Sequence, residues 1–194
     1  MKVISETTGQ YYEDPPVVRI LFSSPRYAWL WAALRGWLGY QWIGAASHKI
    51  GDPNWVQSGV AIREFWEKAV GFAGTGKPPA SLDWYRHFLQ WLLSAHAENV
   101  MGKIIAYGEL AVGIALVLGA VVGVAAFFAA VMNWNYLMAG SVSTNPLLIV
   151  AAVLLIVAWK VGGYFGVDRY LLLRLWKPWR LERLRPLHRT QGAL

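Results

Sequence analysis

Residues 104–139 read IIAYGELAVGIALVLGAVVGVAAFFAAVMNWNYLMA, and this stretch decides the fold. Its first 29 residues are all apolar or glycine, except Tyr107 and Glu109. As one helix, the 36 residues would be roughly 54 Å long, whereas the hydrocarbon core of a membrane is ~30 Å thick. The stretch therefore predicts two membrane helices, with the turn between them at Gly119 and Gly123.

The composition also points to a membrane protein. Of 194 residues, 56% are hydrophobic and only 15% are charged, which is unusual for a soluble domain. The N-terminal 25 residues contain no apolar segment of the signal-peptide type, so we expect the first spanning helix to drive insertion. The chain has no cysteine, which excludes disulfides, thiolate metal sites and iron–sulfur clusters.

Hydropathy predicts four spans and hence an all-α integral membrane protein built on a four-transmembrane-helix bundle. The spans are expected near 27–49, 99–119, 121–139 and 146–166, with an outer loop at 50–98. Pro146 would stand in the first turn of the fourth span, where its missing N–H costs nothing. The remaining parts are a cytoplasmic N-terminal segment (1–25), a membrane domain (26–166) and a basic C-terminal tail (167–194).

Basic residues set the expected orientation. After the fourth span, seven basic residues stand against two acidic ones, and such an excess marks the cytoplasmic side. They are Arg169, Arg174, Lys177, Arg180, Arg183, Arg185 and Arg189, against Asp168 and Glu182. We therefore expect a multi-pass protein of the cell inner (plasma) membrane with both termini cytoplasmic. The tail accounts for most of the net charge of +7, and we expect it to lie on lipid headgroups rather than to bind nucleic acid.

The outer loop predicts two amphipathic helices. Ser58 and Ser81 stand in N-cap positions before GVAIREFWEKAVGF (59–72) and LDWYRHFLQWLL (82–93), in which apolar and aromatic residues recur every three to four positions. We expect both helices to lie across the outer end of the bundle. The glycine- and proline-rich stretch GFAGTGKPPA (71–80) would be the hinge between them.

Glu109 needs a partner, because an unpaired charge inside a membrane is costly. Counted from the ends of their spans, Arg35 lies roughly 14 Å deep and Glu109 roughly 15 Å deep. The matching depths predict a buried ion pair between Arg35 and Glu109. Such a pair serves either function or helix packing, and the sequence leaves both readings open.

Four stretches resemble the DoxX/DoxD family of membrane proteins, and its DoxD-like branch in particular. They are LRGWLGYQWIGAASHKI (34–50), YGELAVGIALVLG (107–119), MNWNYLMAGSVSTNP (132–146) and GYFGVDR (163–169). The resemblance implies a four-helix bundle and, for the DoxD branch, the membrane subunit of thiosulfate:quinone oxidoreductase. That enzyme couples two thiosulfates to tetrathionate and delivers the electrons to membrane quinone. A small companion subunit similar to DoxA would then be a separate chain.

Residue types in the outer half of the bundle suit this chemistry. An aromatic slot with a few polar groups suits a quinone, and cationic groups at the water-facing end suit the thiosulfate dianion. The candidates are Trp42, Asn133 and Asn135 for the quinone, His48, Lys49 and Lys103 for the anion, and Arg35 and Glu109 for catalysis. Glu109 would pass protons to the reduced quinone. We expect quinone as the mobile electron acceptor, and neither a metal nor haem.

Two other functions stay open at this point. The chain is alternatively a non-catalytic integral subunit that assembles or stabilises a larger respiratory or photosynthetic membrane complex. A small transporter or proton pathway through Arg35 and Glu109 is less favoured, because four helices make a narrow conduit and the two halves show no repeat-like symmetry.

Overall fold

The computed structural model describes residues 2–4, 11–13, 15–71 and 77–175. Most of these residues are helical. Strands are limited, in this described part, to a short antiparallel pair, β1 (Lys2–Ile4) and β2 (Tyr11–Glu13). Apart from that pair, the predicted all-α fold class is confirmed for the described residues.

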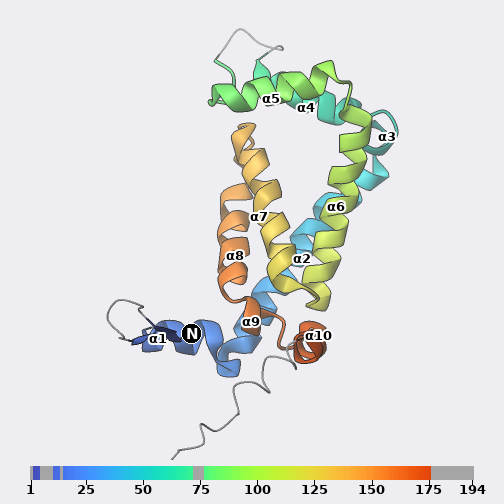
Figure 1. Ribbon diagram of the computed structural model, residues 1–194. Helices are drawn as coiled ribbons and strands as arrows, with labels where there is room; N and C mark the ends of the chain where they lie inside the picture. Colours follow the sequence, from blue (N-terminus) through green and yellow to red (C-terminus); the bar gives the residue numbers. More distant parts are fainter. Residues whose placement is uncertain (1, 5–10, 14, 72–76, 176–194) are drawn as a thin grey trace, which may run out of the picture.

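Four long helices lie side by side, and shorter helices cover their two ends (Figure 1). The long helices are α2 (Ala28–Gly51), α6 (Glu98–Leu118), α7 (Val122–Met138) and α8 (Asn145–Val157). One end carries α3 (Pro53–Val56), α4 (Val60–Val70) and α5 (Asp83–Ser94), and we call it the α5 end. The other carries α1 (Pro16–Ser23), the short 3-10 helix Pro25–Tyr27, α9 (Trp159–Gly162) and α10 (Asp168–Leu175), and we call it the α1 end.

The first three predicted spans coincide with helices to within about two residues, whereas the fourth does not. Pro146 lies in the first turn of α8 as expected, but α8 ends at Val157 and α9 starts at Trp159. The chain turns at Ala158, whose N–H still donates to the Leu154 carbonyl at 2.9 Å. In the described residues one helix, α6, is long and apolar enough to cross a membrane, while α7 and α8 are apolar but shorter.

The long helices pack as two pairs, α2 with α6 and α7 with α8. Two glycines set the register of the first pair. A Cβ on Gly39 would lie 2.8 Å from the Gly113 carbonyl oxygen, and a Cβ on Gly113 would lie 2.9 Å from the Gly39 carbonyl oxygen. Only glycine permits this approach of the two backbones, which is a common device in membrane helix pairs.

The turn between α6 and α7 is held by charged side chains. Gly119 ends α6 with a φ of 67°, which confirms its predicted role, whereas Gly123 lies inside α7. Arg35 donates to the carbonyl oxygens of Leu116 and Val117 at 2.6 and 2.7 Å, so a cation faces the C-terminus of α6.

The N-terminus of α7 is capped by a carboxylate from the first residue of α10. Asp168 accepts hydrogen bonds from the N–H groups of Val121 and Val122 at 2.6 and 2.8 Å. A carboxylate is favourable at this end of a helix, because the first N–H groups lack intrahelical partners. The early turn after α8 brings Asp168 to this position.

The amphipathic helices of the outer loop are present. Their buried faces, with Ile62 and Trp66 on α4 and Leu89 on α5, form a hydrophobic cluster separate from the one between the long helices. The predicted cap at Ser81 is wrong, because Leu82 precedes α5 without a side-chain cap. At α4 the N-cap residue is Gly59, although the Ser58 hydroxyl accepts a long bond from the Val60 N–H at 3.4 Å.

Three predicted segments fall partly outside the described residues. In the N-terminal segment 1–25, positions 1, 5–10 and 14 are not described. In the hinge 71–80, positions 72–76 are not described. The basic tail is described only as far as Leu175, which includes Arg169 and Arg174 in α10.

Candidate functional site

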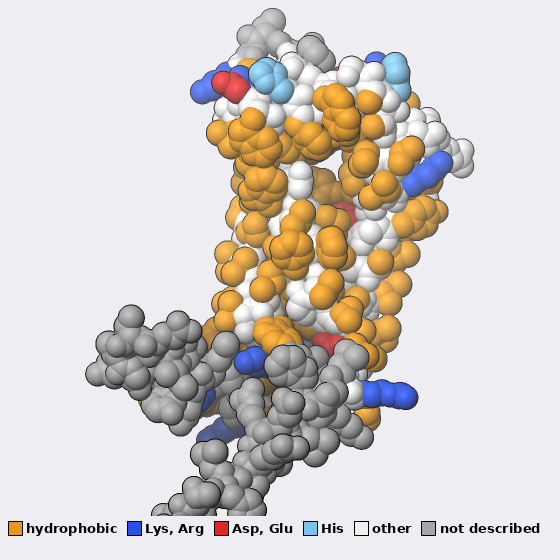
Figure 2. All heavy atoms as spheres, in the orientation of Figure 1, with side chains coloured by type: hydrophobic (Ala, Val, Ile, Leu, Met, Phe, Trp, Pro, Cys, Tyr) orange, Lys and Arg blue, Asp and Glu red, His pale blue; other side chains and the backbone are white. Residues whose placement is uncertain are grey.

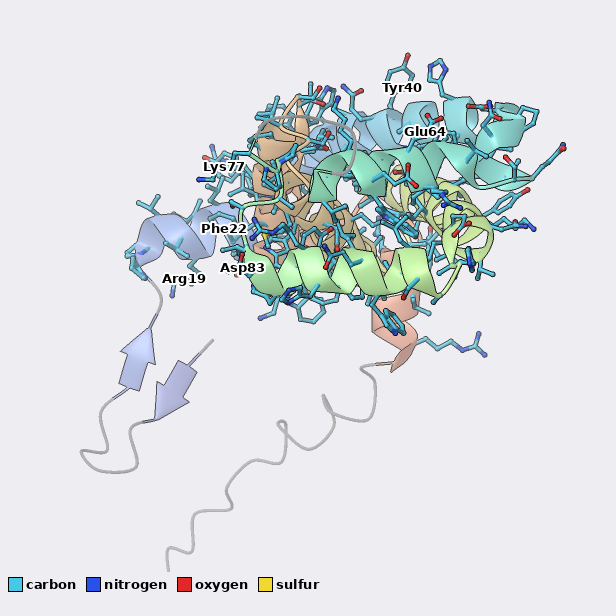
Figure 3. All side chains as sticks on the ribbon, turned by 90° about the horizontal axis from the view of Figure 1, so that it is seen from above. Arg19, Phe22, Tyr40, Glu64, Lys77 and Asp83 are labelled. Carbon is cyan, nitrogen blue, oxygen red and sulfur yellow. The ribbon has the colours of Figure 1, made fainter. Side chains whose placement is uncertain are left out.

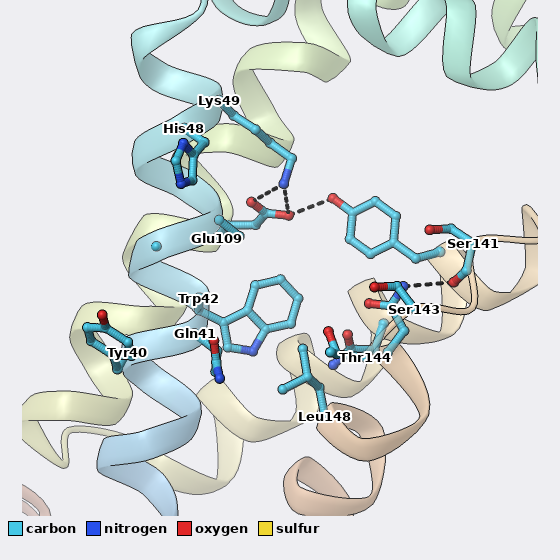
Figure 4. A pocket seen from close by; sticks show the side chains of 15 residues that line it. Tyr40, Gln41, Trp42, His48, Lys49, Glu109, Ser141, Ser143, Thr144 and Leu148 are labelled. Carbon is cyan, nitrogen blue, oxygen red and sulfur yellow. Dashed lines mark hydrogen bonds and ion pairs between the residues drawn. The ribbon is translucent and has the colours of Figure 1, made fainter.

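Five of the eight predicted site residues line one cavity near the α5 end (Figure 4). The cavity measures about 490 Å³ and lies between α2, α6, α7 and the loop that leads into α8. The five are Trp42, His48, Lys49, Glu109 and Asn133. We call this space the polar cavity, because serine, threonine and asparagine side chains of the α7–α8 loop and of the first residue of α8 complete its wall: Ser141, Ser143, Thr144 and Asn145.

Helical spacing brings these side chains together. On α2, Trp42 and Lys49 are seven residues apart, which is two turns, so they lie on one face. On α7, Asn133 and Tyr136 are three residues apart and also share a face. Glu109 enters from the middle of α6.

The partner of Glu109 is Lys49. The Glu109 side chain is fully buried, and its two carboxylate oxygens accept hydrogen bonds from the Lys49 ammonium at 2.9 and 2.7 Å. The Tyr136 hydroxyl donates a third bond to the same carboxylate at 2.5 Å. The ammonium also lies over the Trp55 and Tyr136 rings, 5.2 and 5.6 Å from their centroids. The buried charge is thus paired and hydrogen-bonded, as a low-dielectric site requires.

The predicted ion pair between Arg35 and Glu109 is wrong. Arg35 lies at the α1 end, where it donates to backbone carbonyls, including that of Phe165 at 2.9 Å. The contact of Gly39 with Gly113 sets Glu109 level with Ile43, which is eight residues, or about 12 Å, along α2 from Arg35. Depths counted from expected helix ends cannot reveal this register.

Three buried polar atoms in the polar cavity have no hydrogen-bond partner among the described residues. They are the Trp42 indole Nε1 and both amide atoms of Asn133, Nδ2 and Oδ1. Asn133 is fully buried and Trp42 is 3% exposed. Leaving such a group unpaired costs about 1–3 kcal/mol, so a sequence selected for stability alone would place an apolar residue at position 133.

The other predicted residues lie elsewhere. Lys103 is exposed on α6, outside the wall of the polar cavity. Asn135 faces away from Asn133, and its side-chain amide donates to the Val131 carbonyl at 2.8 Å. The Tyr85 hydroxyl donates to the Asn135 backbone carbonyl at 3.0 Å, and burial raises the pKa of this hydroxyl to about 12, so it stays protonated at neutral pH.

Tyr136 was missed at the sequence level. Its signal was the three-residue spacing from Asn133, which puts the two side chains on one helix face. Tyrosine is common near membrane surfaces for other reasons, so its presence alone indicates no site.

The chain matches no family model, no curated protein and no solved structure. The similarity of its motifs to the DoxX/DoxD family therefore stays a prediction.

The polar cavity suits a neutral ligand that carries carbonyl oxygens. Lys49 and Glu109 neutralise one another, so little net charge is left for an anion. The unpaired groups supply two donor nitrogens and one acceptor oxygen. Within the described residues, no cluster of three or more histidine, aspartate or glutamate side chains could hold a metal ion.

A double-mutant cycle tests the pairing of Lys49 with Glu109. We expect Glu109→Gln to lower the free energy of unfolding by about 3–5 kcal/mol, because it leaves the Lys49 charge buried and uncompensated. Adding Lys49→Met to Glu109→Gln should recover much of that loss. The measurement is unfolding of the purified protein in detergent.

Arg35 provides the matched control for this cycle. Arg35→Met and Glu109→Gln should be additive within about 0.5 kcal/mol, because the two residues share no partner. Coupling in the Arg35 cycle, or additivity in the Lys49 cycle, would contradict the assignment.

Proposed function

We propose that the chain is a multi-pass membrane protein whose polar cavity binds the head group of a quinone. As in the DoxD-like subunit of thiosulfate:quinone oxidoreductase, the quinone would accept electrons from a sulfur anion. The observation that carries the proposal is the set of unpaired polar atoms on Trp42 and Asn133, buried in a cavity beside a proton-bearing network.

The surface of the long helices supports membrane insertion. Exposed apolar side chains cover α6, α7 and α8 between their ends, beyond what a soluble monomer exposes. They include Ile114, Val117, Leu118, Val124, Phe127, Phe128, Val150, Val153 and Val157. Figure 2 shows hydrophobic side chains over the middle of one face, with basic side chains toward the two ends.

The α5 end would face the outside. Arg26, Arg169 and Arg174 are exposed at the α1 end, together with the start of the basic tail, and positive residues favour the cytoplasmic side. All four long helices would cross the membrane, with α8 and α9 together serving as the fourth span.

Hydrogen-bond chemistry supports a quinone head. The Trp42 indole and the Asn133 amide can each donate to a carbonyl oxygen, and the Asn133 Oδ1 can accept from a hydroxyl of the reduced form. The cavity volume of about 490 Å³ lies within the range of small-molecule sites. Its wall is mainly polar, and the aromatic rings of Tyr40, Trp42 and Tyr136 provide flat surfaces against which a quinone ring can pack.

Reduction of a quinone needs a source of electrons and a source of protons. Two thiosulfates joined through a new S–S bond release two electrons, and reduction of one quinone takes up two electrons and two protons. Tyr136 and Glu109, which share a hydrogen bond at 2.5 Å, are the proton-exchanging groups of the cavity wall. His48, exposed at the rim of the cavity, would be the residue that first meets an anion from the aqueous side, because Lys49 is paired with Glu109.

A non-catalytic assembly subunit is the second candidate, favoured by aromatic side chains near the α5 end. Trp84 stacks on Trp134 with ring centroids 6.0 Å apart, and both are exposed. Phe88 and Trp91 form a second exposed stack at 6.2 Å. A partner subunit would bury such a surface. This function needs no quinone binding, so a binding measurement separates the two candidates.

Cysteine labelling tests the topology. Ser81 and Ser23 are both exposed, near the α5 end and at the α1 end respectively, and the natural chain has no cysteine to interfere. In intact cells, a membrane-impermeant maleimide should label Ser81→Cys and should label Ser23→Cys only after permeabilisation. The reverse pattern would overturn the orientation.

Asn133→Leu tests quinone binding. We expect the dissociation constant for a short-chain benzoquinone to rise at least about tenfold, because two hydrogen-bonding atoms are lost. The variant should be as stable as the natural protein or more stable by about 1 kcal/mol, because it removes unpaired buried polar groups. Equilibrium dialysis and thermal unfolding measure the two effects.

The matched control is Asn99→Leu, an exposed position on α6 that lines neither the polar cavity nor its rim. It should leave binding unchanged. If the natural protein binds no quinone, or if Asn133→Leu binds as tightly as the natural protein, the proposal fails.

A further inference from the structure

A second cavity lies under the helices of the α5 end. It measures about 190 Å³ and is lined by residues of α4, α5, α6 and α7. Its wall is apolar and includes Ile62, Phe65, Phe88, Leu89, Met101 and Ile105. We call it the apolar cavity. Figure 3, viewed from above, shows α4 and α5 side by side across this end of the molecule, and Figure 2 shows a hollow between hydrophobic side chains below them.

Tyr136 forms part of the wall of both cavities. Its hydroxyl is held on the polar side by Glu109, and its ring meets the Phe65 ring edge-on at 6.1 Å on the apolar side. The two cavities are therefore neighbours that share Tyr136 as a wall residue. For a ligand with a polar head and an apolar chain, the polar cavity would surround the head and the apolar cavity would surround the chain.

The apolar cavity offers little to a polar ligand. The polar groups of Asn135 and Tyr85 in its wall are bonded to backbone carbonyls or to each other, and the Tyr136 hydroxyl is bonded to Glu109. Phe88 at its edge is 41% exposed, so the cavity has a hydrophobic rim. The flexible side chains of Met101 and Met132 in its wall can adapt to a hydrocarbon chain.

We propose that the apolar cavity receives the first part of the hydrocarbon tail of the quinone whose head lies in the polar cavity. The inference rests on the proposed function, and it assigns the substrate class: a lipid-tailed quinone that enters from the membrane, not a soluble aromatic oxidant. The tail passes Tyr136 and leaves beside Phe88 under α5. Specificity for the tail and for the head then resides in separate residues.

Two adjacent isoleucines on α6 provide the test. Ile105 lines the apolar cavity, whereas Ile104 is 56% exposed and lines neither cavity. Ile105→Trp fills the cavity, and Ile104→Trp adds the same side chain on the exposed face. The ligands are two benzoquinones with identical ring substituents, one without a tail and one with a decyl tail, measured on the purified full chain at one detergent concentration.

We expect Ile105→Trp to weaken binding of the decyl quinone at least tenfold and to leave binding of the tail-less quinone unchanged, with Ile104→Trp altering neither. Equal effects of Ile105→Trp on both ligands, or no effect on either, would overturn the tail site while leaving the proposed function intact. If Ile105→Trp leaves quinone binding unchanged but no longer co-purifies with phospholipid, the tail site is also overturned, because the apolar cavity then holds a lipid acyl chain. If the natural protein binds neither quinone, the proposed function and the tail site fail together.

Met101→Phe is the second cavity-filling variant, because it changes the side-chain volume less than Ile105→Trp does. Its melting temperature should stay close to that of the natural protein. It should reproduce the selective loss of decyl quinone affinity, and its failure to do so in a folded protein would count against the proposal.

Discussion

The burial of the Glu109 carboxylate is the constraint on which the rest of the site depends. A fully buried negative charge is tolerated only with a cation and hydrogen-bond donors around it. Lys49 and Tyr136 meet both needs, and in doing so they tie α2, α6 and α7 together at one depth. The polar cavity is the space left beside this network, because Trp42 and Asn133 line its wall without pairing with one another.

Sequence reasoning found the elements but not their register. Long apolar runs, Gly119 and Pro146 are local signals, and they located α6, α7 and the start of α8. The predicted pairing of Arg35 with Glu109 was wrong, because it depends on the position of α2 along α6. The close approach of Gly39 to Gly113 sets that register, and nothing in the sequence identifies which of several glycines will meet.

The candidate site was predictable to a similar extent. Glu109 and Asn133 were identified as candidates because a polar side chain in an otherwise apolar span is costly and marks a partner or a function. The hydrogen-bonding state of Asn133 was not predictable, because it depends on which groups of neighbouring helices come within reach. The apolar cavity, in turn, arises from how α4 and α5 rest on the long helices, and no local pattern specifies that arrangement.

Photoaffinity labelling tests the central claim, that the unpaired groups of the polar cavity bind a quinone head. A tail-less azidoquinone, irradiated with the purified protein and mapped by mass spectrometry, should label the segments 40–49 and 133–148, which line the cavity. Excess unlabelled quinone should abolish this labelling. Competed labelling near Arg35 and Phe165 at the α1 end, or labelling that excess quinone leaves unchanged, would contradict the account.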